Sequence, residues 1–189
     1  TLKQTYDNNR LSYENVNPTI VRAVPHDMMI TGYKSNTMSV LRLWEARAVG
    51  KFDMKKFDRG EFAESLQEKN ELEAINKVLY PSDHSEKGKV LRLMQEYFLV
   101  SAAMQSILNE YFSKHRGLDK LPKLISVHLN DTHPVFSVPE LMRLLIDKYC
   151  FGWDEAYGIS KDDWKAWHTT TESLIPCKIS QLFLNNIYY

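Results

Sequence analysis

The sequence predicts an α/β fold in which a β-rich first part is followed by long helices. Residues 1–50 alternate short apolar runs with turn residues, and apolar side chains recur at helical spacing from residue 60 onward. A short apolar run near residue 125 then leads into a polar loop and a further helix. We therefore expect mostly strands over 1–50, helix–strand–helix over 60–150, and a last part over 151–189.

The composition is that of an ordinary globular protein and excludes several classes. The 189 residues include 24 basic and 24 acidic side chains, and 43% are hydrophobic. This balance argues against disorder and against a dedicated nucleic-acid binder, which needs a basic face. No apolar run is long enough to predict a membrane span. Cys150 and Cys177 predict two reduced thiols in a reducing compartment, and with no secretory signal in view we expect a cytoplasmic protein.

The first part of the chain predicts a hairpin and two further strands. Asp7–Asn9 is a turn sequence between the runs Leu2–Tyr6 and Arg10–Val16. Ile20–Val24 predicts an apolar strand that ends at a proline, and Thr37–Ala48 predicts a half-buried strand.

Two helices follow, joined by a short polar loop. Helical spacing of apolar residues predicts a first helix over Phe62–Leu79 and a longer second one over about Ser85–Lys114. The loop Tyr80–Asp83 separates them. Asp83 has two interpretations: it is the N-cap of the second helix, or it is a carboxylate that a flexible loop places over a cleft.

The next segment predicts a strand, a polar loop and a capped helix. Leu124–Leu129 is expected to be a buried strand that leads into the polar loop Asn130–His133. Ser137 and Glu140 match a capping box at the start of the following helix. In α/β folds, binding sites collect where strands end, so this loop is the first place to look for chemistry.

The polar loop allows three interpretations that spacing leaves open. Asp131 and His133 can point into one cleft, where they orient a hydroxyl-rich ligand or influence each other's ionisation. Alternatively, the loop residues only shape a turn, which spacing alone favours. In the third interpretation, Asp131 and His133 join His128 in a set of two imidazoles and a carboxylate, as in a metal-dependent hydrolase. His128, however, lies inside the expected strand.

Further along, Trp164 and Trp167 next to His168 form either a sugar-stacking surface or part of a core.

Several segments in order resemble the α-glucan phosphorylases, the family of glycogen, starch and maltodextrin phosphorylases. Order and spacing agree from about Ile20 to Trp153. The matching segments are Ala23–Asp27, Gly32–Thr37, Leu41–Trp44, Val78–Asp83, Leu91–Phe98, Leu129–Pro134 and Pro139–Arg143.

The resemblance implies the fold and the activity of a glycosyltransferase. The family has two Rossmann-like lobes of the GT-B type, and residues 1–189 would be an interior fragment of the N-terminal lobe. With inorganic phosphate, the family cleaves α-1,4-glucans to α-glucose 1-phosphate. It binds pyridoxal 5'-phosphate as a Schiff base in the C-terminal lobe. The resemblance also implies a homodimeric, allosterically regulated parent enzyme.

The resemblance implies a set of residues that line the substrate cleft. They are Asp83, His84, Arg92, Asp131, His133 and His168. Asp83 would sit in a mobile gate over the active site. His84 stands where the family commonly has Asn. Beyond Trp153 the match weakens, and near His168 a tryptophan replaces the family's Asn; divergence, a frame error and decay of the sequence all remain open as causes.

Nothing in the chain matches the lysine that carries pyridoxal phosphate or the basic residues of the other lobe. We therefore expect this chain alone to be inactive and to bind no cofactor. The alternative is a non-catalytic glucan-binding or interaction fragment of the same fold. Separation from the rest of the lobe should also expose apolar surface, for which Trp44, Phe98 and the segment Phe183–Tyr189 are the candidates.

Overall fold

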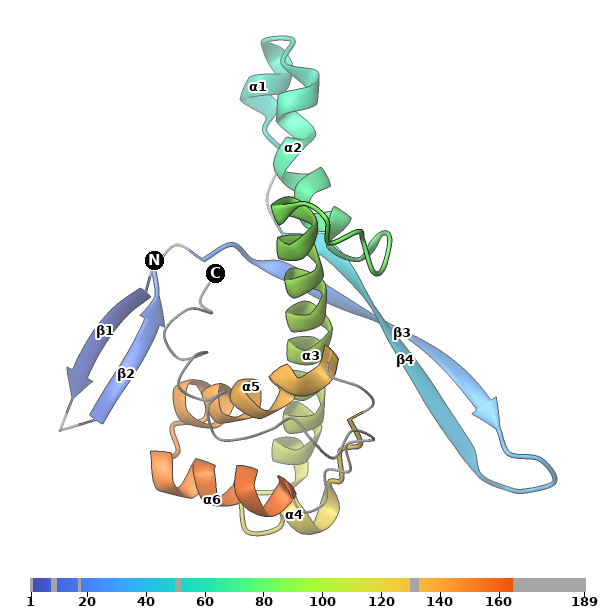
Figure 1. The fold of residues 1–189 in the computed structure, drawn as a ribbon, viewed down its shortest axis with the longest axis vertical. Helices are drawn as coiled ribbons and strands as arrows, with labels where there is room; N and C mark the ends of the chain where they lie inside the picture. Colours follow the sequence, from blue (N-terminus) through green and yellow to red (C-terminus); the bar gives the residue numbers. More distant parts are fainter. Residues whose placement is uncertain (1, 8–9, 17, 50–51, 130–132, 165–189) are drawn as a thin grey trace. The chain divides into compact units, whose positions relative to one another are not determined.

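The computed structural model describes residues 2–7, 10–16, 18–49, 52–129 and 133–164 of the chain. The chain divides into two compact units. Unit 1 comprises residues 1–19 and 100–189, and unit 2 comprises residues 20–99. In the described part the fold mixes helices with small antiparallel sheets (Figure 1), which agrees with the α/β prediction at the level of fold class.

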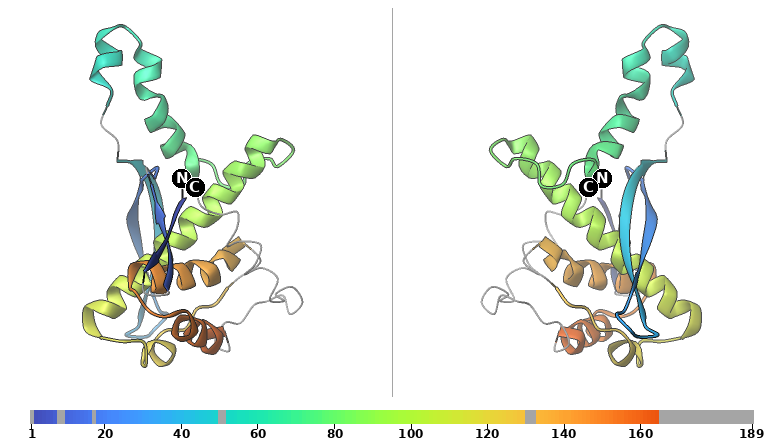
Figure 2. Two further views of the ribbon diagram at one scale, coloured as in Figure 1. Left: turned by 90° about the vertical axis from the view of Figure 1, so that its left-hand side faces the viewer. Right: turned by 90° about the vertical axis from the view of Figure 1, so that its right-hand side faces the viewer.

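Unit 2 is built on one long hairpin, a twisted ribbon of β3 (Val21–Thr31) and β4 (Met38–Ala48) (Figures 1 and 2). The predicted end of the first strand at Pro25 is wrong, because β3 continues through this residue opposite Trp44. A two-stranded sheet leaves each strand one open edge, so a residue without an N–H group is tolerated there.

A charged pair joins the middle of the two strands. The Arg42 guanidinium donates from Nε to Oδ1 of Asp27 and from its second terminal nitrogen to Oδ2, both at 2.7 Å. These two hydrogen bonds hold the pKa of Asp27 below its ordinary value. Arg42 also lies 5.6 Å from the centre of the Trp44 ring, so the cation is in contact with both a carboxylate and an aromatic face.

Apolar side chains are exposed on both faces of this ribbon. Met28 pairs with Leu41 and Met29 with Val40, and neighbouring pairs point to opposite faces of the sheet. With Ile30 and Leu43, these side chains are between 44% and 58% exposed. By contrast, Trp44 and Phe98, which we expected to be exposed, are half-buried.

The rest of unit 2 is helical and is tied to β4 through one asparagine. Short α1 (Met54–Asp58) precedes α2 (Phe62–Glu73) and the 3-10 turn η1 (Ala74–Asn76). The Asn76 side chain accepts a hydrogen bond from the Ala46 N–H at 3.1 Å and donates one to the Trp44 carbonyl. The predicted helix over residues 62–79 thus ends early, where Asn76 turns its side chain to β4.

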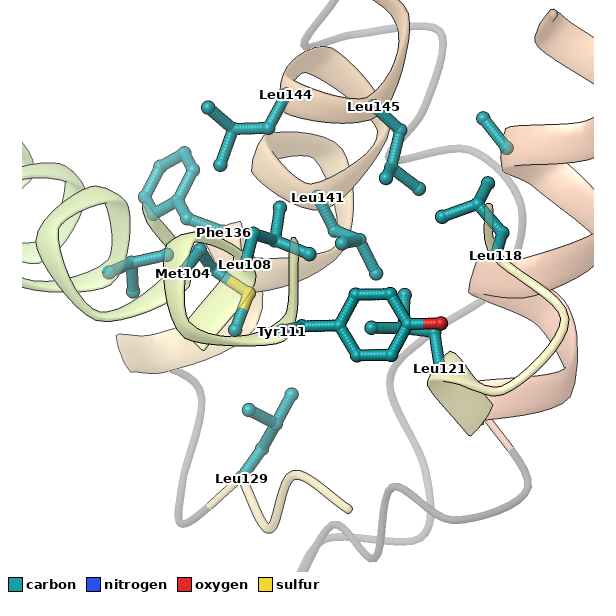
Figure 3. Packing of buried hydrophobic residues seen from close by; sticks show 12 residues of the cluster. Met104, Leu108, Tyr111, Leu118, Leu121, Leu129, Phe136, Leu141, Leu144 and Leu145 are labelled. Atoms are coloured by element: carbon teal, nitrogen blue, oxygen red, sulfur yellow. The ribbon is translucent and has the colours of Figure 1, made fainter. Parts of the chain in front are cut away.

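Helix α3 (Glu86–Lys114) confirms the predicted long helix and contributes to both units. In unit 1, the predicted hairpin of β1 (Leu2–Asp7) and β2 (Arg10–Asn15) is also confirmed. The core of unit 1 collects buried side chains from α3, from the segment after it and from α5 (Ser137–Arg143) (Figure 3). Its members include Leu108, Tyr111, Leu121, Phe136, Leu141, Leu144 and Leu145.

The buried strand expected over Leu124–Leu129 is not formed. Leu121–Leu124 is instead a helical turn, α4, with Pro122 in its first turn, where proline favours a helix start. Residues 125–128 carry no sheet pairing, and one isolated bridge lies at Leu129. Both sheets in the described residues are two-stranded and antiparallel, so this part of the chain contains no parallel sheet of the Rossmann type.

The capping box at Ser137 is also wrong. The 3-10 turn η2 (His133–Phe136) runs directly into α5, so Ser137 is already helical. Its hydroxyl donates to the Pro134 carbonyl at 2.5 Å, and Glu140 makes side-chain contacts elsewhere. A short π-helical segment, η3 (Leu144–Lys148), and α6 (Trp153–Trp164) follow. Among the described residues, no helix is both long enough and apolar enough to cross a membrane.

We predict that the isolated chain self-associates at micromolar concentration through the exposed apolar side chains of the β3–β4 ribbon. The double variant Met28→Glu with Leu41→Lys puts a complementary charge pair on one face of the ribbon, and it should shift the chain toward monomer in light scattering. Exchanging two exposed charges of α2, Glu68→Lys with Lys69→Glu, should leave the association state of the chain in light scattering unchanged. A monodisperse monomer of the unmodified chain would contradict the prediction.

Candidate functional site

The loop between η1 and α3, residues 78–85, is here called the Asp83 loop. It folds back beside the first turns of α3 (Figure 2). Asp83 accepts a hydrogen bond from Arg92 at 3.1 Å, and the two side chains are 58% and 32% exposed. The Arg92 guanidinium lies 6.0 Å from the centre of the Tyr80 ring. An ion pair exposed to this degree contributes less than about 1 kcal/mol, so Asp83 can exchange Arg92 for another partner at little cost.

Ser85, not Asp83, is the N-cap of α3. The Ser85 hydroxyl accepts a hydrogen bond from the Gly88 N–H at 3.1 Å, and its carbonyl accepts one from the Lys89 N–H at 3.0 Å. The first interpretation of Asp83 is therefore wrong, because the cap is already occupied. The Asp83 carboxylate is available for a role in the loop itself.

His84 follows Asp83 in the exposed part of the same loop. Its backbone N–H donates to the Ser82 hydroxyl at 3.4 Å, and its residue surface is open to solvent. The local sequence thus presents a carboxylate and an imidazole side by side on one turn.

Gly88 allows the loop to lie directly against α3. A Cβ atom at this position would stand 1.9 Å from the Ser82 carbonyl oxygen, which is far inside van der Waals contact. The absence of a side chain is what lets the backbone of Ser82 approach the first turn of the helix. Gly88 therefore makes room for the loop backbone beside α3, and Ser85 marks where the loop ends and the helix begins.

Of the residues predicted in the other polar loop, the structure describes His133. It is half-buried and begins η2. Asp131 and His168 lie outside the described residues, so their pairing with His133 stays a prediction. The structure brings Asp83 and Arg92 together within unit 2, whereas His133 belongs to unit 1.

A buried carboxylate anchors the helix that follows His133. Glu140 is 2% exposed, and it accepts a hydrogen bond from the Ser101 hydroxyl on α3 at 2.6 Å. Arg143 donates two further hydrogen bonds to it, at 2.7 and 2.8 Å. The spacing of Glu140 and Arg143 on one helix was visible in the sequence, but nothing in the sequence indicated Ser101 as their partner.

The described residues offer neither a metal site nor a cofactor lysine. Among them, no group of three histidine, cysteine or acidic side chains is placed to hold a metal ion. No lysine whose side chain the structure describes is buried. A Schiff base to pyridoxal phosphate requires an enclosed lysine, so these residues do not fit that group.

Comparison with known proteins gives a consistent family match. Residues 1–176 match the family described as carbohydrate phosphorylase. The chain is 42% identical over 156 residues to glycogen phosphorylase of Bacillus subtilis, an alignment covering 82% of the chain and 18% of that protein.

Similar values hold for relatives from other organisms. The chain is 43% identical to glycogen phosphorylase of Haemophilus influenzae over 75% of its length, and 41% identical to the human brain form over the same share. These alignments cover 17% and 18% of the two relatives. The chain therefore spans less than a fifth of the length of the proteins that it resembles.

The close approach at Gly88 predicts an unfavourable effect of a methyl group there. Gly88→Ala should lower the free energy of unfolding by about 1–3 kcal/mol, because a Cβ would force the Ser82 carbonyl away from α3. Urea unfolding followed by circular dichroism measures this change. Gly158→Ala is the matched control: Gly158 lies in α6 with nothing within 4 Å of a Cβ, and the change should stabilise the chain by up to about 1 kcal/mol. Equal effects of the two substitutions would contradict the close approach.

The buried position of Glu140 predicts a large loss of stability when its carboxylate is removed. Glu140→Ala should cost about 3 kcal/mol, because Ser101 and Arg143 then lose their shared acceptor. Glu110→Ala removes a carboxylate from an exposed pair with Lys114 on α3 and should cost less than about 1 kcal/mol. Urea unfolding of both variants gives the comparison, and a cost at Glu140 no larger than that at Glu110 would refute the anchoring role.

Proposed function

The chain belongs to the carbohydrate phosphorylase family, and we propose that it forms part of the N-terminal lobe of a GT-B enzyme that phosphorolyses α-1,4-glucans. The match over residues 1–176 is the observation that carries this proposal. Similarity of about 40% to glycogen phosphorylases of bacteria and of mammals supports the same activity for the complete enzyme. In that reaction, phosphate oxygen forms a bond to the anomeric carbon, the glycosidic bond breaks, and the leaving sugar oxygen takes up a proton.

The proposed role of this chain is to supply one wall of the substrate cleft. We assign to that wall Asp83, His84, Arg92, Asp131, His133 and His168. The exposed pair of Asp83 and Arg92 supports the assignment, because a carboxylate held by one weak contact can turn toward a sugar hydroxyl, and the released cation can face an anion.

Pyridoxal 5'-phosphate, which the family uses, is assigned to another part of the complete enzyme. The described lysines of this chain are not buried and do not fit it, so no step of the reaction is assigned to the cofactor here. The remaining groups would come from a C-terminal lobe, and general acid–base work requires that both walls be assembled. We further propose a homodimeric, cytoplasmic parent enzyme, on the basis of the family.

A non-catalytic glucan-binding fragment is the second candidate. It is favoured by the exposed polar groups of the Asp83 loop, combined with the lack of a buried lysine among the described residues. Titration of the chain with maltoheptaose separates the two candidates, because a binding fragment should saturate in isothermal calorimetry, whereas one wall of a divided cleft should give no measurable heat.

The two-lobe proposal predicts no phosphorolysis by this chain alone. The purified chain, incubated with pyridoxal phosphate, inorganic phosphate and maltoheptaose, should release no glucose 1-phosphate in a coupled assay. A longer polypeptide that contains this sequence within a complete N-terminal lobe, joined to a C-terminal lobe carrying the cofactor lysine, should release it. Turnover by the isolated chain would overturn the proposal that both lobes are required for the reaction. An inactive longer polypeptide would overturn the assigned activity.

A further inference from the structure

The base of the Asp83 loop rests on one buried polar side chain, Gln95 of α3. Gln95 is 4% exposed, and its amide is directed to the backbone on both sides of Leu79. Its Nε2 donates to the Val78 carbonyl at 2.7 Å, and its Oε1 accepts from the Tyr80 N–H at 3.2 Å. A buried side-chain amide whose donor and acceptor both serve one short backbone segment acts as a clamp on that segment.

The segment that Gln95 holds has an unfavourable backbone conformation. Tyr80 has a φ of 55°, in the left-handed region that residues with a side chain seldom adopt. Such a conformation persists only where surrounding contacts enforce it. The hydrogen bond from the Tyr80 N–H to Gln95 is a contact of this kind, and its acceptor side chain is buried.

The contacts of the loop with α3 fall on a single stripe of the helix. Gly88, Arg92 and Gln95 are spaced i, i+4 and i+7, which places them on one face. Gly88 meets Ser82, Arg92 pairs with Asp83, and Gln95 holds residues 78 and 80. The loop therefore follows one helix face from its base to its tip.

We infer that Gln95 is a positioning residue: it fixes the base of the Asp83 loop on α3, so that Asp83 at the tip can leave Arg92 without release of the whole loop. The clamp is buried and satisfied on both sides, whereas the Asp83–Arg92 pair is exposed. Motion of the loop is then confined to residues between Tyr80 and Ser85. The functional meaning of this arrangement rests on the proposed role of Asp83 in the cleft.

Hydrogen exchange of single backbone amides, read by mass spectrometry on the 189-residue chain without glucan, tests the clamp. Gln95→Met keeps the length and removes both hydrogen bonds, so the Tyr80 amide should exchange at least about tenfold faster. Amides of the β3–β4 ladder should change by less than about threefold. If Gln95→Met does not fold, Gln95→Asn, whose side chain is one methylene shorter, is measured instead, and the same rise in exchange at Tyr80 is expected.

A conservative variant and a matched control make the test specific. Gln95→Glu keeps the size of the side chain but replaces the donor to the Val78 carbonyl with a second acceptor oxygen, so it should lose protection at Tyr80 as Gln95→Met does. Gln105→Met alters another glutamine of α3, which donates to Ser101 within the helix, and should leave the loop amides unchanged.

Unchanged exchange at Tyr80 in Gln95→Met, or an equal rise at all amides, would overturn the inference. So would a Gln95→Glu variant that protects the Tyr80 amide as fully as the unmodified chain does. Because no substrate is used, these results do not depend on phosphorolysis, and an inactive parent enzyme would remove the assigned activity while leaving the clamp intact.

Discussion

Two buried hydrogen-bonding groups on α3 determine where the polar segments of this chain lie. Gln95 holds the base of the Asp83 loop in unit 2. In unit 1, Ser101 donates a hydrogen bond to Glu140, which lies on the helix that follows His133. Both contacts join residues far apart in sequence, and the α3 side chain of each is buried. Since an unsatisfied buried polar group costs about 1–3 kcal/mol, each contact favours one arrangement of its segment over the alternatives. Among the described polar residues, Asp83 and His84 are exposed at the surface.

The features that the sequence predicted correctly are those set by local pattern. The first hairpin follows from the turn at Asp7–Asn9, and α3 follows from its long helical spacing. The polar loop beside α3 was identified from its turn residues between two helical patterns, although the first helix ends earlier than predicted. The ion pair between Asp83 and Arg92 was not itself predicted; it joins this loop to the helix that follows.

The errors arose where a tertiary partner decides between two locally acceptable structures. Leu124–Leu129 has the apolar character of a strand, but it joins neither sheet of the described residues: it continues from the helical turn α4 into residues outside any sheet ladder. Ser137 and Glu140 match a capping box by spacing, yet both side chains have other partners. Ser137 bonds to the preceding 3-10 turn, and Glu140 accepts a hydrogen bond from Ser101. The role of Gln95 could not be predicted either, because its partners are backbone groups that carry no residue signature.

The fixed base of the Asp83 loop has a consequence for the entropy of ligand binding. Ordering a free backbone costs about 1–2 kcal/mol for each residue that is immobilised. Residues 78 and 80 are already held by Gln95. A sugar that engages the tip would therefore need to immobilise only the few residues around Asp83, so most of its contact energy would remain as affinity.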